Sequence, residues 1–382
     1  MEIQILNKDI QNYINANLKA DLHSLLLKKS PFPEVSMQEI VQQIKGKLVA
    51  QKKFPFLLKD GIIFPPQLSL EQSSSQKTAV YKAQLLNGKK FIDLTSGFGI
   101  DAYHLSENFD EITLVEQNPE LLQIVKHNWT ILDKKGNFIN NKLEDFLNQN
   151  QEIFDVIYLD PARRNYDKNK VFLLEDLSPN ILEIQDSLLS ISKQVVIKLS
   201  PLIDLKYLVS VLKNISRIDV IAVKNDVKEV VVFLSQEEAE SIQCHCINLE
   251  SEESDFMFWF GDEENAHAQY SEPEKFIYIP NNTVLKAGIF NLISEKFNLK
   301  KLHPNTHIYT SEIEMKGFPG RIMEIEVIDS KLIKKKSQFN LISKNYPLKP
   351  EEIKKKYNLK DGGNEYLIFT QSKKGKLILK SV

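Results

Sequence analysis

Two short segments of the chain combine residue types that could do chemistry with the spacing that the chemistry requires. The first reads Phe91-Ile-Asp-Leu-Thr-Ser-Gly-Phe-Gly-Ile-Asp101, an apolar run that leads into two closely spaced glycines. Glycines let the backbone pass close to a ligand in conformations that side chains forbid. A helix after such a turn presents free N–H groups at its positive end, where a carboxylate or a pyrophosphate can bind.

Two acids distinguish between these ligands. Asp93 ends the apolar run before the glycine turn, where its carboxylate can hold a cationic amino group but would repel a pyrophosphate. Glu116 ends the next apolar run, where it is placed to accept both hydroxyls of a ribose. Together they favour S-adenosylmethionine (SAM), whose methionine moiety carries the amino group. The alternative is a dinucleotide, because the stretch from Gly97 to Ala102 also satisfies the GxGxxA pattern.

The second segment, Asp160-Pro-Ala-Arg-Arg164, follows the apolar run Phe154–Leu159. Ligands of open parallel sheets bind at the carboxyl ends of strands, so we expect this segment to face the transferring methyl group. It resembles the (Asp/Asn)-Pro-Pro-aromatic motif of amino-methylating enzymes. In that motif the acid and the carbonyl of the first proline accept hydrogen bonds from the two N–H groups of an exocyclic amine. Asp160 and Pro161 would have these roles here.

The chain departs from this motif at two positions. Ala162 replaces the second proline, and Arg163 stands where an aromatic ring usually stacks on the base. An arginine can also stack on a base, or bind O6 and N7 of guanine as a pair. The alternative is that Arg163 and Arg164 only hold phosphates.

The elements around these motifs predict an α/β fold. Short apolar, β-branched runs alternate with helical stretches, which predicts a largely parallel sheet covered on both faces. The runs are Phe91–Leu94, Ile112–Val115, Phe138–Ile139, Val156–Leu159, Val195–Leu199, Val220–Val223 and Val230–Leu234. The predicted helices are Ile100–Glu107, Pro119–Leu132, Pro179–Ser192 and Asp204–Asn214, after the N-terminal helices Asp9–Lys28, Ser36–Lys52 and Gln76–Asn87. The last two runs are too close for a helical crossover, so they predict an antiparallel hairpin. Seven strands that end in such a hairpin are typical of the Rossmann-like class I methyltransferases.

The distribution of charge points to a polyanionic partner. The net charge of the 382 residues is −2, but the segment from Lys331 to Val382 holds 14 Lys and four acids. The segment from Gln236 to Lys275 holds 12 acids and one base. A basic terminal segment on a near-neutral chain favours nucleic acid as the partner. The alternative is a solvated, lysine-rich surface.

The composition also indicates where the protein works. No stretch reaches the ~18 apolar residues of a membrane span, so no membrane partner is expected. The first residues lack the basic start and apolar core of a signal peptide. Two cysteines, Cys244 and Cys246, are too few for a disulfide framework or a zinc site, and no metal is expected. We therefore expect a cytoplasmic protein.

The whole chain resembles a family of SAM methyltransferases, found chiefly in Bacteroidetes, that carry a THUMP-like C-terminal domain. The resemblance rests on Glu71–Lys82, on both motifs above, and on Lys301–His307, Phe318–Arg321, Asn345–Leu348 and Asp361–Tyr366. It implies a ferredoxin-like module and a THUMP-like unit at the C-terminus, and THUMP domains accompany enzymes that modify RNA. The Asp-x-Thr-x-Gly-x-Gly-x-Asp loop is also similar to that of ribosomal guanine-N2 methyltransferases.

These observations predict five segments and two sets of site residues, and the resemblance supplies the identity of the last two segments. The segments are an N-terminal helical region (1–74), a methyltransferase domain (75–235), an acidic connection (236–275), a ferredoxin-like module (276–328) and a THUMP-like basic domain (329–382). The candidate cofactor residues are Asp93, Thr95, Gly97, Gly99, Asp101, Glu116, Gln117, Leu143, Asp145 and Asp160, and the catalytic candidates are Asp160, Pro161, Arg163 and Arg164. The predicted reaction is methylation of a base in structured RNA, with guanine N2 favoured. A small-molecule or protein methyltransferase and a non-catalytic RNA-binding protein are the alternatives.

Overall fold

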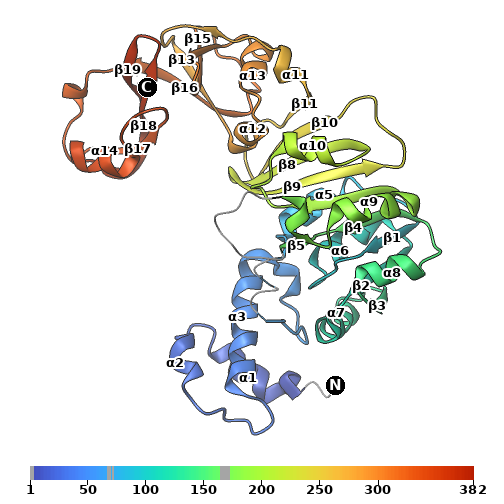
Figure 1. The fold of residues 1–382 in the computed structure, drawn as a ribbon. Helices are drawn as coiled ribbons and strands as arrows, with labels where there is room; N and C mark the ends of the chain where they lie inside the picture. Colours follow the sequence, from blue (N-terminus) through green and yellow to red (C-terminus); the bar gives the residue numbers. More distant parts are fainter. Residues whose placement is uncertain (1–3, 67–69, 71–72, 164–172) are drawn as a thin grey trace. The chain divides into compact units, whose positions relative to one another are not determined.

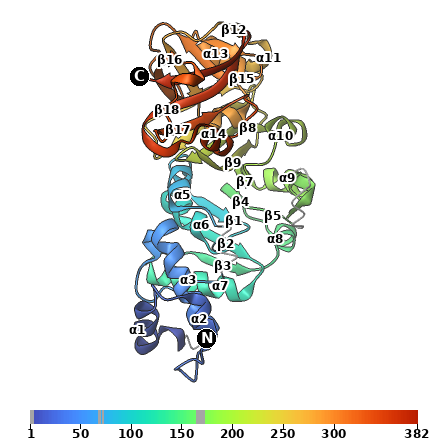
Figure 2. The same cartoon turned by 90° about the vertical axis from the view of Figure 1, so that its left-hand side faces the viewer.

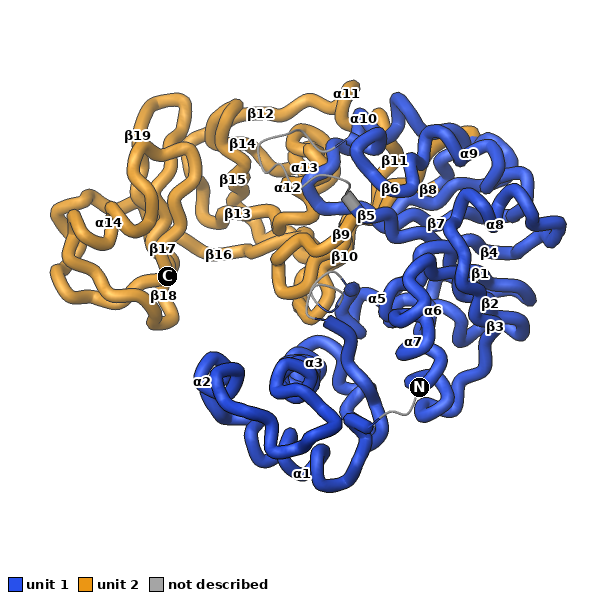
Figure 3. Tube along the Cα trace, turned by 60° about the horizontal axis from the view of Figure 1, so that its bottom comes forward, with its two compact units in different colours: residues 1–216, 231–239 blue, residues 217–230, 240–382 orange. Residues whose placement is uncertain are grey.

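Two units make up the chain in the computed structural model, which describes residues 4–66, 70, 73–163 and 173–382. The first unit contains residues 1–216 and 231–239, and the second contains residues 217–230 and 240–382 (Figure 3). Both candidate motifs lie in the first unit.

A parallel sheet lies at the centre of the first unit (Figure 1). Its strands follow the order β3-β2-β1-β4-β7, with the last part of β9 beside β7. The pairings of β1 with β2 and β4, of β2 with β3, and of β4 with β7 are all parallel. The bounds are β1 Lys90–Asp93, β2 Glu111–Glu116, β3 Asn137–Asn140, β4 Phe154–Leu159, β7 Ser192–Leu199 and β9 Asp226–Ser235. β4 is buried along nearly its whole length, as a strand covered on both faces must be.

Helices cover both faces of this sheet. α5 (Gln76–Ala83), α6 (Ile100–Leu105) and α7 (Pro119–Ile131) lie on one face, and α8 (Leu143–Gln149) and α9 (Ile181–Ser190) lie on the other (Figure 2). α10 (Leu205–Val211) follows β7. Polar side chains cap the N-termini of four of these helices by accepting hydrogen bonds from backbone N–H groups. They are Ser75 for α5, Asn118 for α7, Asn180 for α9 and Asp204 for α10. The βα alternation predicted from the sequence is confirmed, although most of the helices are a few residues shorter than predicted.

The N-terminal region is helical, but the predicted helix Asp9–Lys28 is wrong. It is two helices, α1 (Lys8–Ala16) and α2 (Leu22–Leu26), because Asn17 caps the first and the Asp21 carboxylate accepts the Ser24 N–H of the second. α3 (Met37–Lys53) begins at a capping box formed by Ser36 and Glu39. Apolar side chains of the three helices pack together in one core.

The second unit begins with the predicted hairpin. β8 (Ile215–Val223) and β9 are neighbours joined by the two-residue turn Lys224–Asn225. Both turn residues have positive φ, which is the geometry that lets a two-residue turn join twisted antiparallel strands.

The acidic segment after the hairpin is more than a connection. Its strand β10 (Gln243–Leu249) pairs with β8 in parallel and with β11 (Phe256–Trp259) antiparallel. Cys244 and Cys246 are free and buried in β10, and burial raises the pKa of the Cys244 thiol to about 12. These thiols therefore behave as core residues.

The remaining strands of the second unit form one continuous eight-stranded sheet, in the order β12-β14-β15-β13-β16-β19-β18-β17. Its bounds are β12 Gln269–Tyr270, β13 Phe276–Pro280, β14 Lys300–His303, β15 Thr306–Ser311, β16 Gly320–Val327, β17 Gln338–Ser343, β18 Lys360–Ser372 and β19 Gly375–Ser381. The helices are α11 Asp262–Asn265, α12 Asn282–Ala287, α13 Phe290–Lys296 and α14 Pro350–Tyr357. β16 pairs with both β13 and β19, so the sheet runs through the expected boundary between the two C-terminal modules. Across that boundary the Arg321 guanidinium lies 4.4 Å from the centre of the Tyr366 ring.

Among the described residues, no helix combines the length and apolarity needed to cross a bilayer.

Candidate active site

A cleft opens at the carboxyl ends of β1, β2 and β4, the edge where parallel sheets bind ligands. Its empty space is about 1060 Å³, including the part open to solvent. The walls come from the loop after β1, the end of β2, the start of α8 and the end of β4. The lining residues include Asp93 to Asp101, Val115 to Gln117, Asn141, Leu143, Glu144, Tyr158, Asp160, Ala162, Ser178 and Pro179.

The two glycines of the loop after β1 have positive φ, 52° at Gly97 and 74° at Gly99. A Cβ at Gly97 would meet no atom closer than the Thr95 carbonyl oxygen, at 3.8 Å. The space above Gly97 is therefore open to a ligand. A Cβ at Gly99 would lie 2.9 Å from Cγ1 of Val125 in α7, so this second glycine lets two helices pack closely.

Glu116 is held in place at the end of β2. One carboxylate oxygen accepts the N–H of Gly97 at 3.0 Å, and the other accepts the N–H of Asn118 at 2.8 Å. The Asn140 amide donates to the carbonyl oxygens of Glu116 and Gln117, at 2.8 and 3.1 Å. Glu116 therefore lies directly beside the glycine loop. Asn140 of β3 fixes the turn that follows β2.

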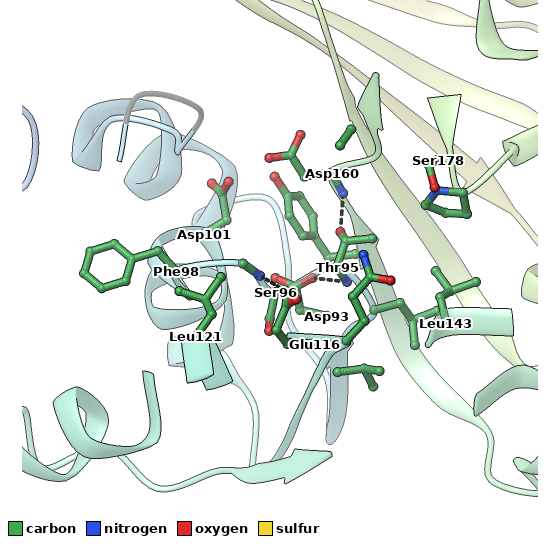
Figure 4. Close-up of a pocket in the computed structure, with 18 of the residues that line it drawn as sticks. Asp93, Thr95, Ser96, Phe98, Asp101, Glu116, Leu121, Leu143, Asp160 and Ser178 are labelled. Carbon is green, nitrogen blue, oxygen red and sulfur yellow. Dashed lines mark hydrogen bonds between the residues drawn. The ribbon is translucent and has the colours of Figure 1, made fainter. Parts of the chain in front are cut away.

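Thr95 connects the glycine loop to the second motif. Its hydroxyl accepts the backbone N–H of Asp160 at 2.6 Å, and its own N–H donates to the Asp93 carboxylate at 2.9 Å (Figure 4). Ala162 and Arg163 form the short strand β5 (Ala162–Arg163), which pairs with β6 (Leu177–Ser178). The Asp160 motif is thus fixed at one end to the loop after β1 and at the other to the segment before α9.

A buried network of charges lies behind the wall of the cleft. The Asp101 carboxylate, in the first turn of α6, forms ion pairs with Lys82 of α5 at 2.8 Å and with Lys198 of β7 at 3.3 Å. The Ser74 hydroxyl donates to the same carboxylate at 2.7 Å and accepts from both lysines. Lys198 also forms an ion pair with Asp160. Asp93 lies close enough for the charges of Asp101, Asp160 and Lys198 to act on it. Of these three acids and two lysines, all but Asp160 are buried, and Asp160 is about one third exposed where it lines the cleft.

The electrostatics of the three acids differ. Burial raises the pKa of Asp93 well above its usual value, and the nearby Asp101 and Asp160 add to this. Burial also raises the pKa of Asp160, against the opposing effect of Lys198. For Asp101 burial is outweighed by Lys82 and Lys198, which hold its pKa well below the usual value. A cationic ligand group beside Asp93 would therefore relieve an unfavourable charge.

The structure brings most of the predicted cofactor residues together. Asp93, Thr95, Gly97, Gly99, Asp101, Glu116, Gln117, Leu143 and Asp160 all line the cleft. Asp145 does not, because it points to solvent from the first turn of α8, and Glu144 lies in the wall instead. Pro161 lies between two lining residues. Arg163 is described only through the backbone pairing of β5, and Arg164 lies outside the described residues.

Sequence reasoning missed the buried lysine of this network. Lys82 is only 1% exposed, and it sits on the same face of α5 as Ala79 and Ala83. A lysine between apolar residues at helical spacing could have indicated a buried acid as its partner. The pairing of Lys198 with Asp160 had no such local signal, because it joins the ends of two strands, β4 and β7, that become neighbours only in the folded sheet.

Three family models match the chain. A model described as a ferredoxin-like domain matches residues 276–319, and one described as THUMP domain-like matches residues 320–380. A third, described as conserved hypothetical protein 95, matches residues 76–197, which include both motifs of the cleft.

Solved and curated proteins resemble the chain as well. The crystal structure of a proposed methyltransferase from Porphyromonas gingivalis superposes with a TM-score of 0.85 and 29% identity, over 99% of this chain and 98% of that one. An uncharacterised RNA methyltransferase of Mycoplasma mobile is 24% identical over 189 residues, 45% of this chain and 52% of that protein. Ribosomal RNA small subunit methyltransferase J of Psychrobacter cryohalolentis is 28% identical over 204 residues, 41% of this chain and 68% of that protein. The chain thus matches about half the length of the first of these two curated relatives.

Proposed function

We propose that the whole protein methylates a base in RNA, through a SAM-dependent methyltransferase domain of the class I fold that is followed by a ferredoxin-like and a THUMP-like domain. We further propose that the acceptor is an exocyclic amino nitrogen, with guanine N2 favoured, and that the reaction takes place in the cytoplasm. One observation carries this proposal most directly: Asp160 lines the same cleft as Asp93, Gly97 and Glu116.

The residues of the cleft fit SAM. The buried Asp93 carboxylate suits the amino group of the methionine moiety, and the open space above Gly97 suits its tail. Glu116 suits the ribose hydroxyls, while Leu143 and Glu144 at the start of α8 suit the adenine. A dinucleotide fits less well, since its pyrophosphate would lie against a buried acid.

SAM supplies a methyl group that is already activated by its sulfonium, so the protein must mainly bring donor and acceptor into line. We propose that the Asp160 carboxylate and the Pro161 carbonyl accept hydrogen bonds from the two N–H groups of the amine. The nitrogen lone pair then points toward the methyl group. We assign Arg163 and Arg164 to the same acceptor, on its base or on its phosphates.

RNA is the acceptor class that the relatives support best. Two curated relatives are named as methyltransferases of RNA, and a THUMP-like model matches the C-terminus. The lysine-rich segment after Lys331 adds a surface suited to phosphates. The domain division given above remains a proposal, and the matched spans 276–319 and 320–380 support its last two segments.

The experiment is transfer of labelled methyl from SAM by the purified protein, followed by digestion of the RNA to nucleosides. The wild type should label a base-methylated nucleoside. Asp160→Ala should bind SAM within a few-fold of the wild type but transfer ~10²–10³ times more slowly, because a contact felt mainly in the transition state is lost. Unchanged transfer by Asp160→Ala would show that the acceptor is held elsewhere.

A further inference from the structure

Lys198 is the residue that joins the Asp160 motif to the buried network. It lies near the end of β7, one residue beyond the Leu159–Ile197 pairing of β4 with β7. Its side chain is only 9% exposed. We infer that Lys198 is a positioning residue for methyl transfer, which holds the Asp160 carboxylate ionised and fixed in direction toward the acceptor. This inference rests on the proposed function.

The ammonium group of Lys198 is itself fixed. Besides Asp160 it contacts the Ser74 hydroxyl at 2.9 Å and the Asp101 carboxylate at 3.3 Å. These partners come from three separate parts of the chain: the end of β4, the segment before α5, and α6. A lysine bound to three such points cannot change rotamer without losing buried contacts.

Fixing the carboxylate matters because Asp160 is not fully buried. Its side chain is 34% exposed, and the Thr95 hydroxyl fixes the backbone N–H of Asp160 but not its carboxylate. A carboxylate on a flexible torsion samples several directions, whereas in-line transfer needs one. Lys198 removes that freedom by its ion pair with the carboxylate, and Asp160 lines the cleft where the acceptor would bind.

The charges around Asp160 make Lys198 important for its ionisation as well. The acids Asp93 of β1 and Asp101 of α6 disfavour a further negative charge, as burial does. The cations that oppose them are Lys198 of β7 and, more weakly, Lys82 of α5. Loss of Lys198 should therefore raise the pKa of Asp160 and move the acidic limb of the rate profile to higher pH.

The test uses the full chain and two readouts. The first is ¹³C NMR titration of the Asp160 carboxyl, identified by the signal that Asp160→Asn removes. The second is single-turnover methyl transfer with SAM affinity measured beside it. Lys198→Gln should raise the Asp160 pKa by about one unit or more and slow transfer by ~10–100-fold. Its SAM affinity should stay within about threefold, and Lys198→Arg should restore most of both losses.

Two controls separate positioning from mere structure. Lys193→Gln removes an exposed lysine at the start of the same strand, paired with Asp155 at 2.6 Å, and should change neither readout. Lys82→Gln removes a buried lysine that pairs with Asp101, and it should shift the Asp160 pKa less than Lys198→Gln does. An unmoved Asp160 pKa in Lys198→Gln, or an equal shift in Lys82→Gln, would overturn the inference. A wild type that methylates no RNA would instead contradict the proposed function, and the titration would still decide the role of Lys198. Should Lys198→Gln fail to fold, Lys198→Met, which keeps the length of the side chain without its charge, takes its place in the same titration, and an unmoved Asp160 pKa there would equally overturn the inference.

Discussion

The two glycines of the loop after β1 are required for different reasons, although they are only two residues apart. Both need the left-handed backbone that glycine adopts freely. Gly97 faces the open cleft, while Gly99 faces Val125 and Trp129 of α7. Substitution of each should therefore fail in a different way.

We predict that Gly97→Val abolishes SAM binding, because its side chain would enter the space of the methionine tail. Its thermal midpoint should fall only by the cost of positive φ. Gly99→Val should unfold at a clearly lower temperature than Gly97→Val, because a Cβ at position 99 would lie 2.9 Å from Cγ1 of Val125. Calorimetry with SAM and thermal melts of both variants check this. SAM binding by Gly97→Val at wild-type strength would contradict the site.

Residue types that terminate strands could be read from the sequence. Asp93, Glu116 and Asp160 each end or follow an apolar run, and all three line the cleft. Of the predicted cofactor residues at the start of α8, Leu143 lines the cleft and Asp145 does not, whereas the adjacent Glu144 does, because neighbouring residues of a helix point about 100° apart. Lys82 and Ser74 could not be assigned to Asp101, since only the folded chain brings α5 and α6 together.

At the scale of elements, the ion pair of Lys82 with Asp101 joins α5 to α6 under the cofactor loop. Asp101→Asn would leave both lysines of the network without this carboxylate. Breaking one partner of a buried pair costs ~3–5 kcal/mol, so the free energy of unfolding should fall by about that amount at neutral pH. Asp186→Asn, which breaks the exposed pair with Lys213, is the control and should cost little.

The pH dependence of this loss follows from the depressed pKa of Asp101 in the folded state. The stabilisation is present above the unfolded value of 3.8 and is lost as pH falls toward the lower folded value. Denaturant unfolding of the wild type and Asp101→Asn should therefore differ most at neutral pH and converge in acid. A difference that stays constant with pH would show that Asp101 is not ionised in the fold.

The order of elements was predictable wherever local signals were strong. Alternating apolar runs predicted the seven strands, and the short connection predicted the hairpin whose turn is Lys224–Asn225. The break between α1 and α2 was missed because the apolar spacing continues across Asn17 and Asp21. The pairing of β10 with β8 was also not predictable, since a parallel partner is set by the sheet and not by the local pattern.

At the scale of the whole molecule, the charge of the C-terminal segment is divided between paired and unpaired lysines. Lys354 pairs with Glu351 at 3.1 Å and also with Asp361, so its charge is partly used within the fold. Lys334 and Lys335 are exposed and form no ion pair within the part of the chain that the structure describes. These two are the better candidates for phosphate contacts.

We predict that Lys334→Glu with Lys335→Glu weakens RNA binding and flattens its salt dependence. Each lost phosphate contact should reduce the slope by about 0.7 on a single strand, so the double variant should lose roughly 1.4. Lys28→Glu with Lys29→Glu, the same charge change in the N-terminal region, should leave the slope unchanged. SAM affinity should not move in either. Equal slopes in the wild type and the Lys334 variant would leave these lysines as solvated surface.

Comparison of the modified nucleosides of RNA from wild-type and deletion cells tests the central claim most directly. The proposed function predicts that one base-methylated nucleoside disappears on deletion. It should return with the wild-type chain but not with Asp160→Ala expressed at the same level. Nucleoside profiles that are identical in all four strains, while purified protein transfers labelled methyl to a small molecule or a protein, would contradict an RNA substrate.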